Sequence, residues 1–302
     1  MKQYLEILDR CLNNPFYDWE INKRTGKRTI GVLGAVLQHD MNDGFPLVTT
    51  KRMAVKSIFA ELEMFIKGRT DKKFLWDRNC KIWNGWANPV KVQEKYDLAP
   101  CQTVGLKEKI AEEEPDLGPI YGYQWRNFDG PYDFNIANSD NPVYTIDQVS
   151  DVIAKLKSDP SDRRMVVSAW NPKQVREMAL PPCLVLHHII VKGGKLSLNM
   201  YQRSCDMFLG VPFDLASNAM LLLLYAKEGG FKPGYLSMFL ADAHIYEDHV
   251  SQVREQLSRK PHPLPAMEIP DENWNGMLNW GYTDFNLKDY VCHDAIKAEV
   301  SR

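Results

Sequence analysis

Apolar side chains recur along the chain with two spacings, one of about three to four residues and one near two. The longer spacing predicts amphipathic helices over residues 2–13, 54–66, 145–157 and 245–257. Residues 213–227 are almost wholly apolar, which predicts a buried helix. These helices need an apolar surface to pack against, and the predicted strands can provide it.

Runs rich in Val, Ile and Leu predict strands over residues 29–41, 165–170, 184–191, 195–202 and 236–241. Lys192-Gly193-Gly194 predicts a hairpin turn between two of them. Strands and helices are interspersed without strict β-α-β alternation, so the predicted fold class is α+β. We expect one domain over residues 1–302, with the charged, proline-bounded stretch 91–115 as a surface insertion.

Composition excludes several classes of protein. Lys+Arg 37 against Asp+Glu 39 gives a formal net charge of −2, which argues against a general nucleic-acid binder. The N-terminus has no signal-peptide pattern, and the most apolar stretch, 220–226, is too short to span a bilayer, so no membrane partner is expected. The six cysteines form no CxxC pair and indicate reduced thiols in a cytoplasmic protein.

Three polar strings lie beside apolar runs. Leu180-Pro-Pro-Cys183 puts a cysteine at a strand entrance, where it could act as a nucleophile, although a lone cysteine is more often a buried structural residue. In Tyr201-Gln-Arg-Ser-Cys-Asp206, strand alternation would point Arg203 and Cys205 to one face and Gln202, Ser204 and Asp206 to the other. Asp162-Arg-Arg164 offers two guanidiniums for a phosphate, or an exposed salt-bridged loop.

A metal site is not expected. His244 and His249 are five residues apart, which would put them on different faces of a helix, and no cysteine cluster adds further ligands.

Several strings occur in the order found in one family. They are Asp43-Gly-Phe-Pro-Leu-Val-Thr-Thr-Lys-Arg52, Gly118-Pro-Ile-Tyr-Gly-Tyr-Gln-Trp-Arg126, Asp162-Arg-Arg164, Val167-Ser-Ala-Trp-Asn171, Pro182-Cys183 and Tyr201-Gln-Arg-Ser-Cys-Asp-Met-Phe-Leu-Gly210. Together they resemble thymidylate synthase over nearly the whole chain. The resemblance implies that family's fold, a large mixed sheet packed with helices, and a homodimer in which one face of the sheet forms the interface.

The resemblance also implies a folate-dependent reaction. Cys183 as a thiolate would add to C6 of a pyrimidine nucleotide, and C5 would then attack the one-carbon unit of 5,10-methylenetetrahydrofolate. Glu61 would organise water and proton transfer at the base, and Tyr121 would assist at C5. The other implied substrate-binding residues are Arg24, Gln202, Arg203, Ser204, Asp214, His244 and Tyr246, with Arg163 and Arg164 reaching the neighbouring subunit's phosphate. The implied folate-contacting residues are Ile82, Trp83, Trp86, Leu180, Asp206, Leu209, Gly210 and Phe213.

One departure from the family changes the expected substrate. Asp214 stands where thymidylate synthases carry an asparagine that reads the base edge. Uracil presents an N3–H donor and an O4 acceptor, which an amide can satisfy. Cytosine presents an N3 acceptor and an N4 amino donor, which a protonated carboxyl can satisfy, and an ionised carboxyl can pair with cytosine protonated at N3. The sequence therefore favours dCMP over dUMP.

Further departures bear on the product. Leu184 replaces the family's histidine after the nucleophile, and Met53-Ala54 replaces its usual Cys-His. The tail at residues 296–302 is polar where the family has an apolar closing tail, so water would add to the intermediate and give a 5-hydroxymethyl product, unless the polar terminus is merely dispensable. The pattern resembles the deoxycytidylate hydroxymethylases that some bacteriophages use, which would work in the host cytoplasm.

Three alternatives remain. Trp83 and Trp86, which would shield the intermediate, are compatible with a dCMP methylase or a thymidylate synthase that tolerates Asp214. A catalytically idle nucleotide-binding member of the family is the third, and the presence of Cys183 and Glu61 speaks against it.

Overall fold

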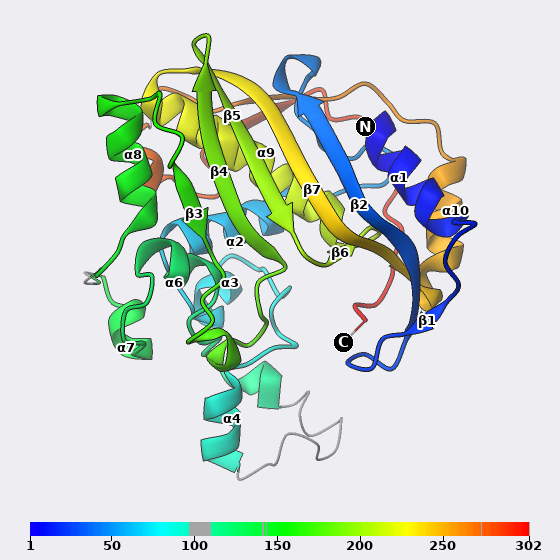
Figure 1. Ribbon diagram of the computed structural model, residues 1–302, viewed down its shortest axis with the longest axis horizontal. Helices are drawn as coiled ribbons and strands as arrows, with labels where there is room; N and C mark the ends of the chain where they lie inside the picture. Colours follow the sequence, from blue (N-terminus) through cyan, green and yellow to red (C-terminus); the bar gives the residue numbers. More distant parts are fainter. Residues whose placement is uncertain (97–109, 141, 143, 273, 302) are drawn as a thin grey trace. The chain divides into compact units, whose positions relative to one another are not determined.

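The computed structural model describes residues 1–96, 110–140, 142, 144–272 and 274–301 (Figure 1). The chain divides into two compact units. The first consists of Met1–Val55, His187–Trp274 and Asp284–Arg302, and the second of Lys56–Leu186 and Asn275–Thr283. Each unit contains part of the predicted site, and each is described by itself.

The first unit is built on a mixed sheet whose strands follow the order β1-β2-β7-β5-β4, with β6 beside β7. The strands are β1 Glu20–Ile21, β2 Arg28–Asp40, β4 Leu184–Lys192, β5 Lys195–Gln202, β6 Cys205–Asp206 and β7 Lys232–Tyr246. β2 pairs with β7 antiparallel, whereas β5 and β6 pair with β7 in parallel. A small antiparallel pair, β8 Ala266–Glu268 and β9 Asn286–Lys288, lies outside this sheet. The sheet packed with helices confirms the predicted α+β class.

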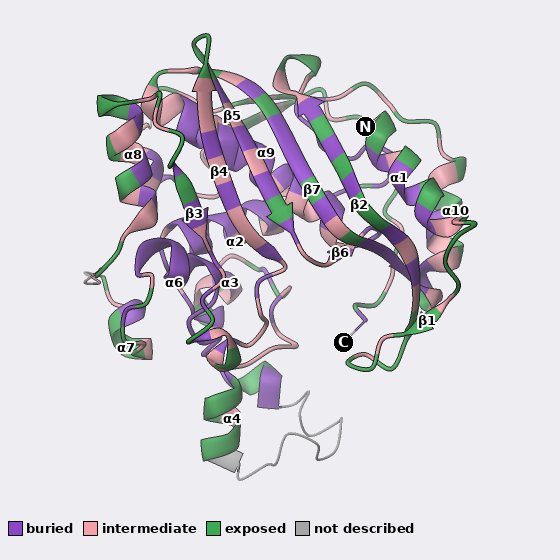
Figure 2. Cartoon of the chain, viewed as in Figure 1, coloured by how far each residue is buried: buried purple, intermediate pink, exposed green. Residues whose placement is uncertain are grey.

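Helices cover one face of this sheet. They are α1 Lys2–Leu12, which packs on β2 and β7, α9 Gly210–Gly229, which packs on β5 and β7, and α10 Val250–Ser258, which packs on α1. Most of α9 is buried, as its apolar sequence predicts (Figure 2). The sequence therefore identified both the buried helix and the strands on which it packs.

Two sequence predictions about this unit have the wrong bounds. The strand expected at 236–241 is much longer, since β7 spans Lys232–Tyr246, and the helix expected at 245–257 begins only at Val250, after the short 3-10 helix η3 Glu247–His249. The reason is long-range pairing, because Tyr246 still has a register partner in Thr29 of β2. His244 therefore lies in a strand, not on a helix.

The second unit is mainly helical. Its helices are α2 Val55–Ile66, α3 Lys72–Trp76, α4 Pro89–Tyr96, α6 Tyr121–Arg126, α7 Phe134–Ala137 and α8 Gln148–Ser158, with a helical turn at residues 110–113. β3 Val166–Ser168 lies beside the beginning of β4, where Ala169 N–H donates to the Val185 carbonyl at 2.8 Å. This unit also contains the short 3-10 helices η2 Val175–Glu177 and η4 Met277–Asn279, whereas η1 Met41–Asp43 belongs to the first unit. Of the insertion predicted at 91–115, residues 97–109 lie outside the described residues.

Phe65 on α2 is the centre of the second unit's aromatic core. Its ring stacks on Tyr121 with centroids 4.9 Å apart and meets Trp125 edge-on at 5.8 Å. Trp83 closes the cluster at 6.4 Å from Phe65. This packing fixes α6 against α2 and thereby sets the position of Tyr121.

Candidate active site

Cys183 belongs to the second unit and directly precedes β4, as the Pro-Pro-Cys string predicts. The first three residues of β4 belong to the second unit and the others to the first. It is half-buried, whereas Cys11, Cys80 and Cys205 are buried. The backbone N–H of Cys183 donates a hydrogen bond to the Tyr121 hydroxyl at 2.7 Å. Because Tyr121 is itself fixed by stacking on Phe65, its phenol oxygen has a defined position next to the cysteine.

Glu61 belongs to the same cluster. It lies on α2, half-buried, and its carboxylate accepts a hydrogen bond from the Trp83 indole N–H at 2.6 Å. The Trp83 ring lies edge-on to Tyr121 at 6.2 Å and to Trp86 at 5.8 Å. The structure thus joins the backbone of Cys183, a phenol, a carboxylate and two indoles through direct contacts. This set can supply a nucleophile, proton-transfer groups and an aromatic surface.

The remaining predicted residues of the second unit lie close by in the chain. Ile82 precedes Trp83 and is half-buried, and Leu180 is half-buried three residues before Cys183. Leu184, the first residue of β4, is 6% exposed. A buried Leu184 cannot offer the hydrogen bonds that a histidine would make.

Asp214 is the central polar residue of the first unit's cluster. It lies on α9, where its carboxylate Oδ2 accepts a hydrogen bond from Gln202 Nε2 at 2.6 Å. Desolvation raises the pKa of Asp214 to about 7, against the opposing effect of the Gln202 hydrogen bond, and the nearby Asp206 charge adds to the rise. Asp214 can therefore carry a proton near neutral pH, which is what recognition of an acceptor at cytosine N3 requires.

Gln202 also corrects the predicted geometry of the polar string. β5 ends at Gln202 and β6 begins at Cys205, so strand alternation does not continue through Arg203 and Ser204. The bend between the strands is tied by the Cys205 thiol, which donates to the Gln202 carbonyl at 3.4 Å. Among the described residues, the buried Gln202 Oε1 has no hydrogen-bond partner.

Asp206 orders the loop that leads into α9. Its Oδ1 accepts hydrogen bonds from the backbone N–H groups of Phe208 and Leu209, at 3.0 and 3.1 Å. Gly210 follows as the first residue of α9, and a Cβ added there would lie 3.5 Å from the Asp206 side chain. Phe213, one turn further on, is half-buried. Four of the predicted folate contacts therefore occupy one short, well-ordered segment.

His244 and Tyr246 lie near the end of β7, both buried. His244 Nδ1 contacts the Asp242 carbonyl at 3.2 Å, and although desolvation lowers its pKa, the interaction with Asp242 raises it overall. Its other ring nitrogen, Nε2, is buried without a hydrogen-bond partner in the part of the chain that the structure describes. Tyr246 meets the His244 ring edge-on at 5.1 Å. A buried, unsatisfied ring nitrogen is suited to a ligand hydroxyl.

The predicted phosphate ligands are divided between the units. Arg24 is exposed in a turn before β2, and Arg203 and Ser204 are half-buried after β5, all in the first unit. Arg163 and Arg164 are exposed in the second unit, after α8. Arg164 Nε lies 2.8 Å from Asp162, and its hydrogen bonds hold the pKa of that carboxyl well below its usual range.

Two features of the first unit were not predicted from the sequence. Lys51 is buried, donates to the Phe208 carbonyl, and lies 3.7 Å from the centre of the Phe208 ring. Burial lowers its pKa to about 8. The polar tail is also anchored, since His249 Nε2 lies 2.8 Å from the Glu299 carbonyl and the Ser301 hydroxyl donates to Asp248 at 3.2 Å. The Thr-Thr-Lys-Arg string could have indicated Lys51, but nothing local indicates the tail contacts.

Within the described ranges, no group of three or more His, Cys, Asp or Glu side chains could hold a metal ion. In the same ranges, no helix is both long enough and apolar enough to cross a bilayer.

Comparisons with known proteins agree with this geometry. Residues 2–302 match the protein family described as "Thymidylate synthase". A thymidylate synthase of Mycoplasma pneumoniae (strain ATCC 29342 / M129 / Subtype 1) is 38% identical over 311 residues, covering 100% of both chains. The family match over residues 2–302 and the full-length relative at 38% identity show that the chain belongs to the thymidylate synthase family.

Proposed function

We propose that this chain converts dCMP into 5-hydroxymethyl-dCMP. Membership of the thymidylate synthase family supports the general reaction, in which a one-carbon unit is transferred from 5,10-methylenetetrahydrofolate to a pyrimidine nucleotide. The choice of cytosine rests on the protonatable carboxyl of Asp214 and its hydrogen bond from Gln202. The choice of hydroxymethyl over methyl rests on the polar tail.

The chain's own residues account for the early steps. The Cys183 sulfur forms a bond to C6 with its own electron pair, and the π electrons of C5–C6 move toward C5, which becomes nucleophilic. 5,10-Methylenetetrahydrofolate supplies the methylene carbon that C5 attacks. Once C5 is joined to the methylene carbon, the C5 proton would leave through Tyr121 and the Glu61 carboxylate. Its electron pair would break the carbon–nitrogen bond to the folate, so that tetrahydrofolate departs and an exocyclic methylene remains at C5. The edge-to-face pair Trp83 and Trp86 fits a flat, heteroaromatic pterin.

The proposed base recognition depends on which atoms of Asp214 and of the base donate and accept hydrogen bonds. Asp214 Oδ2 accepts a hydrogen bond from Gln202. A proton on the carboxyl would donate to the cytosine N3 acceptor, and a carboxyl lone pair would accept from the N4 amino group. Uracil would present a donor at N3 and an acceptor at O4. With the same proton facing N3, the uracil N3–H would meet a donor and its O4 would meet a lone pair, and such mispairing discriminates strongly.

A thymidylate synthase acting on dUMP is the second candidate, and one observation favours it. The Mycoplasma relative, at 38% identity over the whole chain, carries that name. Overall similarity therefore points to uracil, whereas the residue at position 214 points to cytosine. The two candidates share the same Cys183 chemistry and differ only at the base edge and in the final step.

The final step depends on water. In the proposed reaction, water adds to the exocyclic methylene at C5, its oxygen bonding to the carbon, and departure of the Cys183 sulfur restores the C5–C6 double bond. Hydride transfer to the same methylene would instead give a methyl group, as in a dCMP methylase. A closed site excludes water and favours hydride transfer. Because the tail carries Glu299 and Ser301 in place of apolar residues, we propose that it admits water.

The same proposal includes a homodimer formed through the uncovered face of the sheet. Val36, Phe239 and Tyr201 lie in one row across β2, β7 and β5, and they are 52%, 43% and 44% exposed. Large apolar side chains aligned in this way are typical of a protein interface. The occupant that we propose is a second copy of the chain, whose Arg163 and Arg164 would reach the phosphate.

Product analysis tests the proposal. The enzyme is incubated with 5,10-methylenetetrahydrofolate and either dCMP or dUMP, and the products are identified by mass spectrometry. We expect turnover of dCMP to a product heavier by one oxygen than 5-methyl-dCMP, with no dihydrofolate absorbance change. Asp214→Asn should reverse the preference toward dUMP. Preferential turnover of dUMP by the unchanged enzyme would establish the second candidate, and stoichiometric dihydrofolate with dCMP would establish a methylase.

A further inference from the structure

We propose that Lys72 is a positioning residue for folate binding, acting through the backbone of Trp86. This inference rests on the proposed folate-contacting role of Trp83 and Trp86, but not on which pyrimidine is the substrate. Lys72 lies on α3, outside the motifs that identify the family.

Lys72 is a fully buried lysine with 0% exposure. Its ammonium group donates to the Trp86 carbonyl at 2.7 Å and also to the Ala111 carbonyl. Burial lowers its pKa to about 8, partly offset by the charges of Glu114 and Glu112. A charged group held without water in this way is costly unless its hydrogen bonds are made. Both carbonyls are therefore tightly held.

The Trp86 carbonyl is well placed to transmit this restraint. The Trp86 N–H donates to the Trp83 carbonyl at 3.1 Å, and the two indole rings meet edge-on. Trp83 in turn donates its indole N–H to Glu61. Fixing the peptide of Trp86 consequently fixes the aromatic pair on which the pterin would lie.

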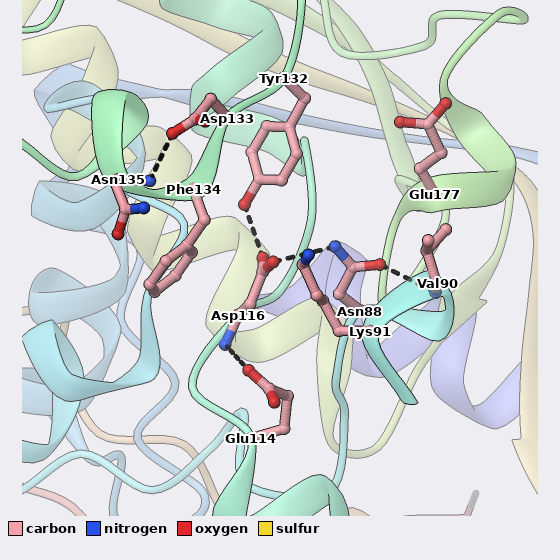
Figure 3. A pocket seen from close by; sticks show the side chains of 10 residues that line it. All are labelled: Asn88, Val90, Lys91, Glu114, Asp116, Tyr132, Asp133, Phe134, Asn135 and Glu177. Atoms are coloured by element: carbon pink, nitrogen blue, oxygen red, sulfur yellow. Dashed lines mark hydrogen bonds between the residues drawn. The ribbon is translucent and has the colours of Figure 1, made fainter. Parts of the chain in front are cut away.

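A second attachment lies two residues after Trp86. Asn88 donates from its backbone N–H to the Asp116 carbonyl at 2.7 Å and from its side chain to the Asp116 carboxylate at 3.0 Å (Figure 3). Asp116 also accepts from the Tyr132 hydroxyl at 2.6 Å, on one side of a pocket of about 460 Å³. Residues 86–88 are therefore tied to residues 111–116 directly at Asn88, and at Trp86 through Lys72.

Residues 110–115 end the insertion predicted at 91–115. Lys72 bonds to Ala111 within this segment, and its own backbone N–H donates to the Pro115 carbonyl at 2.9 Å. Through Lys72, the end of the insertion and the tryptophan pair share one cation. This gives the end of the insertion a role in holding the folate surface.

The test is Lys72→Met, which keeps the length of the side chain and removes its donors. The Michaelis constant for 5,10-methylenetetrahydrofolate should rise about tenfold, as expected for loss of hydrogen bonds from a charged group. The Michaelis constant for the nucleotide, and kcat at saturating folate, should change less than twofold. Lys73→Met, at the exposed neighbouring position of α3, is the matched control and should leave all three constants unchanged.

The assay uses whichever of dCMP or dUMP the unchanged enzyme turns over, so a wrong choice of base does not affect it. If Lys72→Met does not fold, Lys72→Leu, which likewise has no donor, is measured in the same way. An unchanged folate constant in a folded variant would overturn the proposal. Equal losses for folate and nucleotide would also overturn it, because they would indicate general destabilisation of the second unit.

Discussion

At the scale of single residues, the proposed chemistry depends on Cys183 and on the neighbours that hold it. Its backbone N–H fixes the Tyr121 hydroxyl, and Tyr121 is fixed by Phe65. The thiol itself is half-buried at the start of β4. Such an arrangement presents a nucleophile on a rigid backbone without burying it.

Cys183→Ser tests this role. A hydroxyl is a far weaker nucleophile than a thiolate, so turnover should fall by at least about a thousandfold. Nucleotide binding, measured by calorimetry, should change little because the serine occupies nearly the same volume. Appreciable turnover by the serine variant would exclude Cys183 as the nucleophile.

The proposed role of Asp214 predicts a pH dependence of base recognition. Recognition of neutral cytosine needs a proton on the carboxyl, and its pKa of about 7 means that this proton is lost above neutral pH. The value of kcat/KM for dCMP should therefore decline with rising pH above about 7. For Asp214→Asn, kcat/KM measured with dUMP should not show this decline above about pH 7.

The same pKa shift has a defined sign in stability. Between about pH 4 and 7 the folded state keeps a proton on Asp214 that the unfolded chain has lost. The free energy of unfolding therefore decreases as pH rises through this window. A thermal midpoint of Asp214→Asn with the same pH dependence as the unchanged protein would contradict the assignment.

At the scale of elements, α2 supplies two carboxylates with different roles. Glu61 is half-buried and bonds to Trp83, whereas Glu63 is buried and forms ion pairs with Arg78 at 2.9 Å and Lys67 at 2.6 Å. Glu63 also accepts from the Tyr282 N–H at 3.2 Å. The buried carboxylate thus joins α2 to two other segments of the second unit.

Glu63→Gln should reduce the free energy of unfolding by about 2–3 kcal/mol, since it leaves partly buried cations without a charge partner. Urea denaturation measures this loss. Although desolvation opposes them, the hydrogen bonds from Arg78 and Lys67 lower the pKa of Glu63, so its stabilisation should be present at neutral pH and lost as pH falls below about 4.5.

The control for Glu63 is Glu94→Gln on α4. Glu94 pairs with Lys91 at 3.3 Å, and both side chains are exposed. The expected loss is below about 0.5 kcal/mol. Similar losses of unfolding free energy in the two variants would show that burial does not determine how much the Glu63 ion pairs stabilise the fold.

At the scale of the whole molecule, the proposed dimer makes each site depend on two chains. The row of Val36, Phe239 and Tyr201 offers a surface for a second copy. Arg163 and Arg164 are exposed and would complete the partner's phosphate site. Activity should therefore be recoverable from two inactive variants.

Mixing tests this expectation. Cys183→Ser and the double variant Arg163→Ala/Arg164→Ala should each be nearly inactive as homodimers. After unfolding and refolding together, the mixture should regain up to about a quarter of the normal activity, because half of the dimers are hybrids with one intact site. Each variant refolded alone is the control. A mixture no more active than its parts would show that the arginines act within their own chain.

Local patterns were enough to predict much of this protein. The helix expected at 2–13 is α1, the strand at 29–41 is β2, and the apolar stretch at 213–227 lies within α9. Cys183 was correctly predicted at a strand entrance. These features depend on periodicity and on proline, which act over a few residues, so the sequence by itself determined them.

Other features depend on partners far away in the chain. β7 extends to Tyr246 because β2 pairs with it, the proton affinity of Asp214 depends on Gln202 and on burial, and Lys72 is buried because two carbonyls receive its charge. Nothing near Lys72 in the sequence distinguishes it from the exposed Lys73. Only the tertiary structure decides such features, since burial and long-range hydrogen bonds exist only after the chain has folded.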